Sequence, residues 1–195
     1  MSESLSKGMR NREALVSAAA RLFWQGGFHG TSLADIAKAA DIPVGNLYYY
    51  FKTKSEVALA VASGFVADTQ DMLDEIAATS PDPRRRLSLL AQRLAASQRA
   101  RLTHGCPVAA AVREFRAGAP SASAKAGEVF TLIAGFVSSE SGRTGLRPAL
   151  ALAAGRSAVA EWQGGIVLGH ALSDAAVIAE SARRLSRILG VQEAH

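Results

Sequence analysis

The segment from residue 31 to residue 56 constrains the fold of this chain more than any other stretch of its 195 residues. Thr31 or Ser32 can cap a helix, and apolar residues follow at the spacing of one helical face: Leu33, Ile36, Ala37 and Ala40. Asp41 and Ile42 then make a turn. Pro43 suits the first position of a second helix, because its missing N–H would be unpaired there anyway. The pattern predicts two short helices joined by a tight turn.

Longer helices are predicted on both sides of this pair. The first is expected from near Arg10 to Gly26, because apolar residues repeat along one face: Leu15, Ala18, Ala19, Leu22 and Phe23. After the pair, Thr53 and Glu56 form a capping box that opens a helix to about residue 78. Two short helices with a third packed across them form a helix-turn-helix domain. We place this domain at residues 8–54, with the motif itself at residues 32–51.

The remainder of the chain also has the pattern of helices. Helical segments are expected at residues 84–104, 107–117, 123–140, 148–170 and 173–189, and glycine or proline separates the first four of them. No segment shows the sustained alternation of a β-strand. The fold class predicted is all-α with about nine helices. Residues 55–195 form the second domain, and the fourth helix contributes to both halves.

Composition limits the partners and the cellular site. The net charge of +5 suits a polyanionic partner. The single cysteine, Cys106, excludes an intramolecular disulfide framework and fits a reducing compartment. No signal-peptide pattern opens the chain, and no apolar run approaches the roughly 18 residues that span a bilayer. We therefore expect a cytoplasmic protein with no membrane partner.

The second helix of the pair is the expected reader of duplex DNA. In a helix-turn-helix, this helix enters the major groove with its first residues leading. Those residues are Pro43, Val44, Gly45 and Asn46. Gly45 lets the backbone approach the duplex closely, and the Asn46 amide can pair with adenine or reach a phosphate.

Further DNA contacts are expected around this helix. Tyr48, Tyr49 and Tyr50 point in three directions on a helix, so at most two of them can join Phe51 in the core. An exposed tyrosine offers a ring for sugar contact and a hydroxyl for phosphate. The remaining expected contacts are a hydroxyl pair before the first short helix and a lysine pair before the fourth helix, where an anion would meet free N–H groups: Thr31, Ser32, Lys52 and Lys54.

Residues 10–60 resemble the DNA-binding domain of the TetR/AcrR family of bacterial transcriptional regulators. The matching residues are Gly27-Phe28, Thr31-Ser32, Ile36-Ala37, Ala40, Gly45, Leu47-Tyr48, Phe51, Lys54 and Val57. Two positions depart from the family pattern. Asp41 stands where glycine is usual, and aspartate tolerates the left-handed conformation better than most residues. Val44 stands where a lysine or small polar residue is frequent, and it offers apolar contact to a thymine methyl instead.

The resemblance implies a homodimeric repressor that binds a palindromic operator and is released by a small-molecule effector. It implies that the C-terminal helices form the effector pocket and the dimer interface. The pocket candidates are Phe65, His104, Cys106, Phe130 and Trp162, and the interface candidates are Gly165, Gly169, Leu172, Ile178 and Leu185. Glu114, Glu128 and Glu161 hint at a cationic effector.

Other classes of function were weighed against this one. Cys106 precedes an expected helix, where a thiol pKa falls, so a redox or electrophile sensor is one alternative, and a transcriptional activator is another. An enzyme is not expected, because the four histidines lack metal-ligand spacing and no glycine-rich phosphate loop follows a strand. For the same reasons, we expect no metal and no cofactor.

Overall fold

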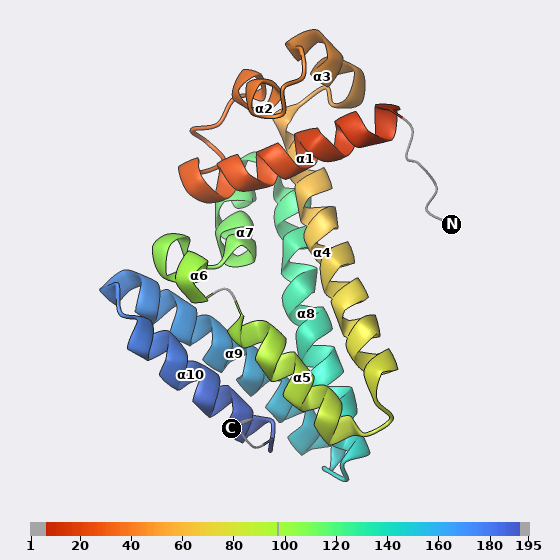
Figure 1. Ribbon diagram of the computed structural model, residues 1–195, viewed down its shortest axis with the longest axis vertical. Helices are drawn as coiled ribbons and strands as arrows, with labels where there is room; N and C mark the ends of the chain where they lie inside the picture. Colours follow the sequence, from red (N-terminus) through yellow and green to blue (C-terminus); the bar gives the residue numbers. More distant parts are fainter. Residues whose placement is uncertain (1–6, 97, 192–195) are drawn as a thin grey trace. The chain divides into compact units, whose positions relative to one another are not determined.

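The computed structural model describes residues 7–96 and 98–191. This part of the chain holds ten helices and no strand, so the predicted all-α class is confirmed (Figure 1). The helices are α1 (Lys7–Gly26), α2 (Leu33–Ala39), α3 (Val44–Tyr50), α4 (Lys54–Thr79), α5 (Pro83–Ala95), α6 (Gln98–His104), α7 (Pro107–Gly118), α8 (Pro120–Arg143), α9 (Pro148–Leu172) and α10 (Ala175–Ile188). None of these helices is long and apolar enough to cross a membrane.

The segment predicted as one helix over residues 84–104 forms two helices, α5 and α6. Asp82 caps α5 by accepting a hydrogen bond from the N–H of Arg84, and Pro83 takes the first helical position. The break comes at Ala96, whose backbone is extended at φ −63° and ψ 158°. Neither glycine nor proline marks this break, so sequence punctuation alone could not locate it.

Contacts divide the chain into two compact units. The first comprises the residues up to Val66 together with Pro107–Gly127, and the second comprises Ala67–Cys106 and the residues from Glu128 onward. Helix α4 therefore contributes to both units. The predicted division into a DNA-binding domain at residues 8–54 and a ligand-binding and dimerisation domain at residues 55–195 concerns function, and it stays a prediction.

The first unit has an apolar core between α1–α3, the start of α4, α7 and the start of α8. Three aromatic rings meet edge to face in it: the centroids of Phe23 and Phe28 lie 5.3 Å apart, and Phe115 of α7 lies 5.6 and 5.1 Å from them. Such pairs contribute roughly 0.5–1.5 kcal/mol beyond the burial of their area. Ile36 and Leu47 join the same core, which fixes the orientation of α2 and α3 on α1.

The second unit relies on close helix packing. Helix α9 presents glycines to its neighbours: a Cβ on Gly155 would collide with the Ala134 carbonyl of α8, and one on Gly165 would collide with Ser181 of α10. Ser181 donates a hydrogen bond of 2.7 Å to the carbonyl of Glu161. The buried pair of Arg86 and Glu140, at 3.3 Å, joins α5 to α8.

Candidate nucleic-acid interface

Helix α2 begins with a complete capping box. The Ser32 Oγ accepts a hydrogen bond from the Asp35 N–H at 3.1 Å, and the Asp35 carboxylate accepts from the Ser32 N–H at 2.9 Å. The Ser32 hydroxyl also donates to Asp35 at 2.7 Å. These bonds lower the pKa of Asp35, the side-chain bond from Ser32 most of all. The cap fixes where α2 starts, as the sequence predicted.

The turn between α2 and α3 uses Asp41 in place of glycine. Asp41 has a φ of 54°, the left-handed conformation that the sequence analysis expected it to tolerate. The Ile42 N–H returns to the Ala37 carbonyl at 3.0 Å, which closes the end of α2. Pro43 lies one position earlier than predicted: it caps α3, which begins at Val44.

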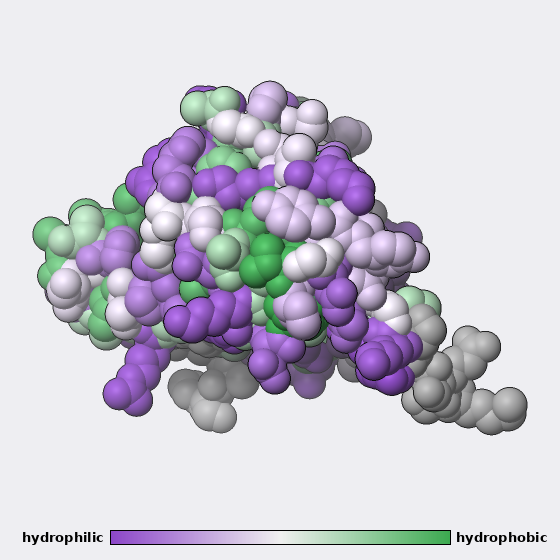
Figure 2. Space-filling view, turned by 90° about the horizontal axis from the view of Figure 1, so that it is seen from above, coloured by the Kyte–Doolittle hydropathy of each residue, from purple (hydrophilic) through white to green (hydrophobic). Residues whose placement is uncertain are grey.

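The two faces of α3 have opposite environments. Leu47 is fully buried on the inner face, and Phe51 is buried just after the helix, as predicted. On the outer face, Val44, Gly45, Asn46, Tyr48 and Tyr49 are exposed, and Tyr49 retains 79% of its surface. Figure 2 views the molecule from the α2–α3 end and shows hydrophilic side chains spread over that face, with a smaller group of apolar ones between them.

Tyr50 behaves differently from the other two tyrosines. It is half-buried and packs against the apolar core of the first unit. Its ring meets that of Tyr49 edge to face at 5.1 Å. Tyr50 therefore supports α3 from below and orients Tyr49, while Tyr48 and Tyr49 present their rings to solvent.

Thr31 and Lys54, both predicted to contact phosphate, have partners inside the protein. Thr31 is only 6% exposed, and its hydroxyl donates to the Gly27 carbonyl at 2.8 Å. The Lys54 ammonium donates to the carbonyls of Phe28 at 2.8 Å, Thr31 at 2.9 Å and His29 at 3.4 Å. It also lies 4.5 Å from the centroid of the Phe28 ring. Because an ammonium has three donors, these carbonyls use its capacity, and both residues hold the α1–α2 loop.

The start of α4 is likewise satisfied by its own side chains. The Glu56 N–H donates to the Thr53 hydroxyl at 3.1 Å, and the Glu56 carboxylate accepts from the Lys52 N–H at 2.8 Å. Two N–H donors at the predicted anion site, those of Lys52 and Glu56, therefore have partners within the chain. The Lys52 side chain is exposed, and its ammonium reaches the Tyr48 carbonyl at 2.5 Å, which keeps its charge beside α3.

Residues 15–61 match the family model described as bacterial regulatory proteins, tetR family. This match spans α2, the Asp41 turn and α3, which are the elements whose geometry is given above. Residues 15–61 are therefore similar to the DNA-binding segment of the tetR family.

Curated TetR-family relatives align with only part of their length. The chain is 37% identical over 79 residues to the HTH-type transcriptional repressor KstR2 of Rhodococcus jostii, which covers 40% of this chain and 39% of that protein. It is 46% identical over 50 residues to the HTH-type transcriptional regulator RutR of Escherichia coli, covering 26% and 24%. The chain thus spans well under two thirds of these relatives.

Solved structures of TetR-family proteins share the fold over nearly the whole chain. A TetR transcriptional regulator from Legionella pneumophila superposes with a TM-score of 0.78 at 19% identity, covering 98% of this chain and 100% of that one. A regulator from Cytophaga hutchinsonii gives 0.79 at 21% identity, covering 99% and 100%. At these identities the likeness establishes the fold alone.

Four of the five residues predicted for a TetR-type dimer interface pack within one chain. Gly165 faces Ser181, Gly169 faces Ile178, and Leu185 is buried. The reason is that the glycine face of α9 receives α10 of the same chain. Only Leu172 is exposed, at 60%. The exposed apolar residues of α9, which the sequence analysis did not single out, are Leu150, Leu152, Val167 and Leu168.

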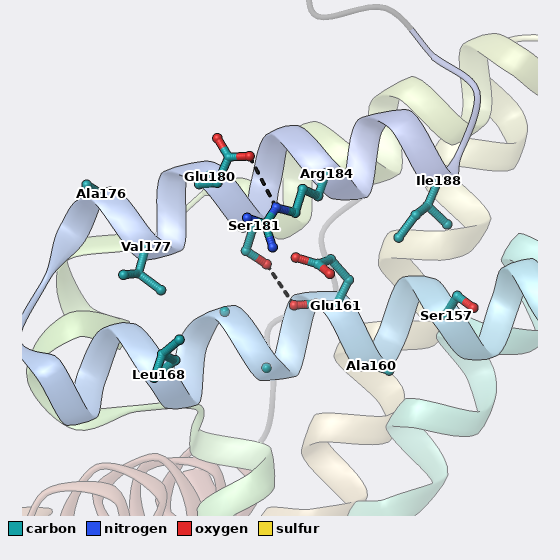
Figure 3. Close-up of a pocket in the computed structure, with 12 residues that line it drawn as sticks. Ser157, Ala160, Glu161, Leu168, Ala176, Val177, Glu180, Ser181, Arg184 and Ile188 are labelled. Carbon is teal, nitrogen blue, oxygen red and sulfur yellow. Dashed lines mark hydrogen bonds and ion pairs between the residues drawn. The ribbon is translucent and has the colours of Figure 1, made fainter.

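An open groove of about 810 Å³ runs between α9 and α10. Leu168 of α9 and Val177 of α10 point toward one another in it (Figure 3). Gly164 also lines the groove, and a Cβ there would meet nothing within 4 Å. Glu180 forms ion pairs along α10 with Arg183, Arg184 and Arg187, and these pairs lower its pKa, chiefly through the bonds from Arg183.

The predicted pocket residues are distributed over the two units. Phe65 belongs to the first unit and packs against its core, whereas His104, Cys106, Phe130 and Trp162 belong to the second. Cys106 is buried directly before α7. Trp162 contacts Arg101 of α6, whose guanidinium carbon lies 5.0 Å from the indole centroid. The described residues contain no group of three metal-ligating side chains close enough to hold a metal ion.

Glu114 is a structural residue of this TetR-type domain that the sequence did not reveal. Its carboxylate accepts a hydrogen bond of 2.7 Å from the Phe28 N–H and pairs with Arg113 at 3.1 Å. It therefore ties α7 to the α1–α2 loop, and its charge is already used within the first unit. A contact between residues 86 positions apart leaves no local signal in the sequence.

Proposed function

We propose that this chain is a transcriptional regulator that binds duplex DNA through α2 and α3. The observation that carries the proposal is the division of α3 into two faces. Leu47 holds its inner face in the core, while Val44, Asn46 and Tyr49 remain exposed on the outer face. A short helix displayed in this way has the geometry of a recognition helix. The family match supports the same function.

Each exposed residue of α3 suits a different DNA contact. Pro43, Val44, Gly45 and Asn46 lead the helix and would face base edges, with Val44 against a thymine methyl and Asn46 on adenine. Tyr48, Tyr49 and Lys52 would contact sugar and phosphate, which position the protein without specifying sequence. Thr31, Ser32, Lys54 and Tyr50 would act indirectly by holding the elements in place.

The DNA proposal is tested by selecting bound sequences from random duplexes and measuring their affinity by fluorescence anisotropy. Asn46→Ala should change the preferred base at one position per half-site and cost about 1–3 kcal/mol there. Lys52→Gln should weaken binding to all sequences, whereas Lys125→Gln on α8 serves as a charge-matched control. Selection of no sequence above random by the folded protein would contradict the proposal.

The regulator is proposed to act as a homodimer on a palindromic operator. A dimer places two recognition helices on half-sites one or more helical turns apart, which matches two-fold DNA symmetry. The surface that supports it is the groove between α9 and α10, where Leu168 and Val177 are accessible and Gly164 leaves open space. Leu172 continues this face of α9, and together these groups form an apolar surface that a second copy would cover.

Substitution on two sides of α9 tests the dimer. Leu168→Arg should yield monomers by light scattering, because a charge would have to be buried in the interface. Leu152→Arg is a matched control, since at about 100° per residue it lies roughly 160° around the helix from Leu168. If both variants remain dimers, the interface lies elsewhere. If both become monomers, α9 does not pair through this face alone.

Repression with release by a small effector is the mode of action proposed for the dimer. Release requires the effector to bind one conformer of the regulator more tightly than the other. A promoter–reporter strain distinguishes the modes, because deletion of a repressor raises reporter output and deletion of an activator lowers it. The burial of Cys106 limits access of electrophiles to its thiol. Unchanged DNA affinity after alkylation of Cys106 would exclude sensing through this residue.

A further inference from the structure

Arg101 holds a half-buried positive charge in the second unit. It extends from α6 over the indole of Trp162, and it donates a hydrogen bond to the Leu94 carbonyl at the end of α5. Within the described part of the chain, no carboxylate forms an ion pair with this guanidinium. Burial lowers the pKa of Arg101, and the neighbouring Cys106 opposes that shift. An arginine nevertheless stays protonated in proteins, so the charge persists without an acidic partner.

Two neighbouring residues of α9, of which Trp162 contacts Arg101, also carry polar groups without partners among the described residues. Trp162 is about nine-tenths buried. Its indole Nε1 is buried as well and has no hydrogen-bond acceptor among the described residues. Gln163, the next residue on α9, has both its amide nitrogen and its amide oxygen buried and unpartnered. The great majority of buried polar atoms in proteins have a hydrogen-bond partner, so a buried polar atom without one requires an explanation.

The Arg101 guanidinium, which lacks a carboxylate partner among the described residues, and the unpartnered groups of α9 have a similar hydrogen-bonding preference. The guanidinium and the indole N–H only donate hydrogen bonds, and the glutamine amide adds two further donors and one acceptor. An oxyanion accepts several hydrogen bonds at once and neutralises the guanidinium, often with two parallel bonds. A cationic effector, at which the glutamates of the sequence hinted, would be repelled by Arg101. Glu114 in particular is already bonded to Phe28.

We infer that the second unit binds a small organic carboxylate, with its anionic head at Arg101 and Trp162 of α6 and α9. The inference names the chemistry of the effector and so rests on the small-molecule response proposed above. The stem of the ligand would be apolar, since the buried residues one turn before and one turn after Trp162 on α9 are Ala158 and Ile166.

Calorimetric titration of the purified full-length protein tests this site without DNA. The probes are benzoate and hexanoate, each compared with its uncharged amide, benzamide and hexanamide. At least one carboxylate should bind at one site per chain, and its amide should bind at least tenfold more weakly. This comparison uses the unaltered protein, so it does not depend on the folding of any variant.

Variants locate the site on Arg101. Arg101→Met should weaken carboxylate binding at least tenfold, whereas Arg99→Met, an exposed arginine of the same helix, should leave it unchanged. Trp162→Phe keeps an aromatic ring but removes the orphaned N–H, and it should weaken binding severalfold. Circular dichroism confirms that each variant folds.

Several outcomes would overturn the inference. Absence of binding by both carboxylates, equal binding of acid and amide, or equal binding to Arg101→Met and Arg99→Met would each do so. Failure of the proposed function is seen separately, as absence of DNA binding by the free protein. A carboxylate that binds at Arg101 without releasing DNA supports the site and contradicts only its role in release.

Discussion

Helices α3 and α9 both contain glycine, and they use it in opposite ways. A Cβ added at Gly45 of α3 would meet nothing within 4 Å, whereas one added at Gly165 of α9 would collide with Ser181. The space at Gly45 is open to another molecule. The space at Gly165 is filled by α10 of the same chain. A glycine in a helix interior costs roughly 1 kcal/mol relative to alanine, so each position requires a compensating contact.

The difference between the two helices predicts that substitutions at their glycines affect different measured properties. Substitution at Gly165 should affect folding, because the contact it permits lies within the protein. Substitution at Gly45 should affect DNA binding, because the contact it permits involves a molecule outside it. Gly164, next to Gly165 but open to the groove, provides a control on the same helix.

The largest expected effect is that of Gly165→Ala on stability. The added methyl group displaces Ser181 and disturbs its 2.7 Å bond to the Glu161 carbonyl, so the free energy of unfolding should fall by about 1–3 kcal/mol. Gly164→Ala should instead raise it by up to about 1 kcal/mol through helix propensity. Urea titration measures both. Adding Ser181→Gly to Gly165→Ala should restore part of the lost free energy of unfolding. If Gly165→Ala and Gly164→Ala changed the free energy of unfolding equally, the proposed difference between the two glycines would be wrong.

Gly45→Val should weaken DNA binding by about tenfold or more, equivalent to at least about 1.4 kcal/mol. The side chain would stand where the backbone of α3 approaches the duplex. The free energy of unfolding should be unchanged or slightly raised, because the added group meets no protein atom. Anisotropy and urea titration on the same preparation give the two values. Loss of stability together with affinity would show that Gly45 serves the fold.

Lys54→Met tests whether the lysine supports the fold or contacts DNA directly. It removes donors to three loop carbonyls, so the free energy of unfolding should fall by about 1–2 kcal/mol. The slope of log affinity against log salt should stay unchanged, whereas Lys52→Met should reduce that slope by about 1. A reduced slope for Lys54→Met with full stability would instead show that Lys54 binds phosphate.

Ser32→Ala removes the cap of α2 and should lower the free energy of unfolding by about 1 kcal/mol. Ser32→Asn keeps a capping side chain and should retain most of the stability, which makes it the matched control. Thermal unfolding followed by circular dichroism distinguishes the two variants. An alanine variant as stable as the unaltered protein would mean that α2 is held by core packing alone.

The smallest expected effect is the acid dependence contributed by Asp35. Its pKa in the folded protein lies below the ordinary value of 3.8, so the stability it contributes is complete above that pH and is lost as the pH falls below it. The difference in unfolding free energy between the unaltered protein and Asp35→Asn should therefore narrow between pH 5 and pH 2.5. If this difference in unfolding free energy stayed constant between pH 5 and pH 2.5, the charge of Asp35 would not contribute to the stability of the α2 cap.

Local signals in the sequence predicted the structure of α2, α3 and the turn between them well. The Ser32 cap, the left-handed Asp41 and the burial of Phe51 each depend on residues a few positions apart. The partners of Thr31 and Lys54 were missed, although the donors themselves were noticed. Lys54 bonds to carbonyls 23 to 26 residues earlier, and only the folded loop brings those carbonyls together.

The sequence predicted most of the C-terminal helices, but it did not predict which helices pack against one another. Gly165 and Gly169 were predicted as dimer-interface residues, because sequence alone could not show whether α10 of the same chain or a second copy approaches them. The break at Ala96 lacks a glycine or proline to mark it. Arg101 has no carboxylate partner in the described part of the chain, a property of three-dimensional placement that residue spacing does not show.

The position of Trp162 has a practical consequence. The chain contains two tryptophans, and they fall in different compact units: Trp24 on α1 in the first and Trp162 on α9 in the second. Trp24→Phe and Trp162→Phe would therefore each leave a single intrinsic fluorophore that reports on one unit. Coincident melting curves of the two variants would reveal one cooperative unfolding transition, whereas separate curves would reveal two.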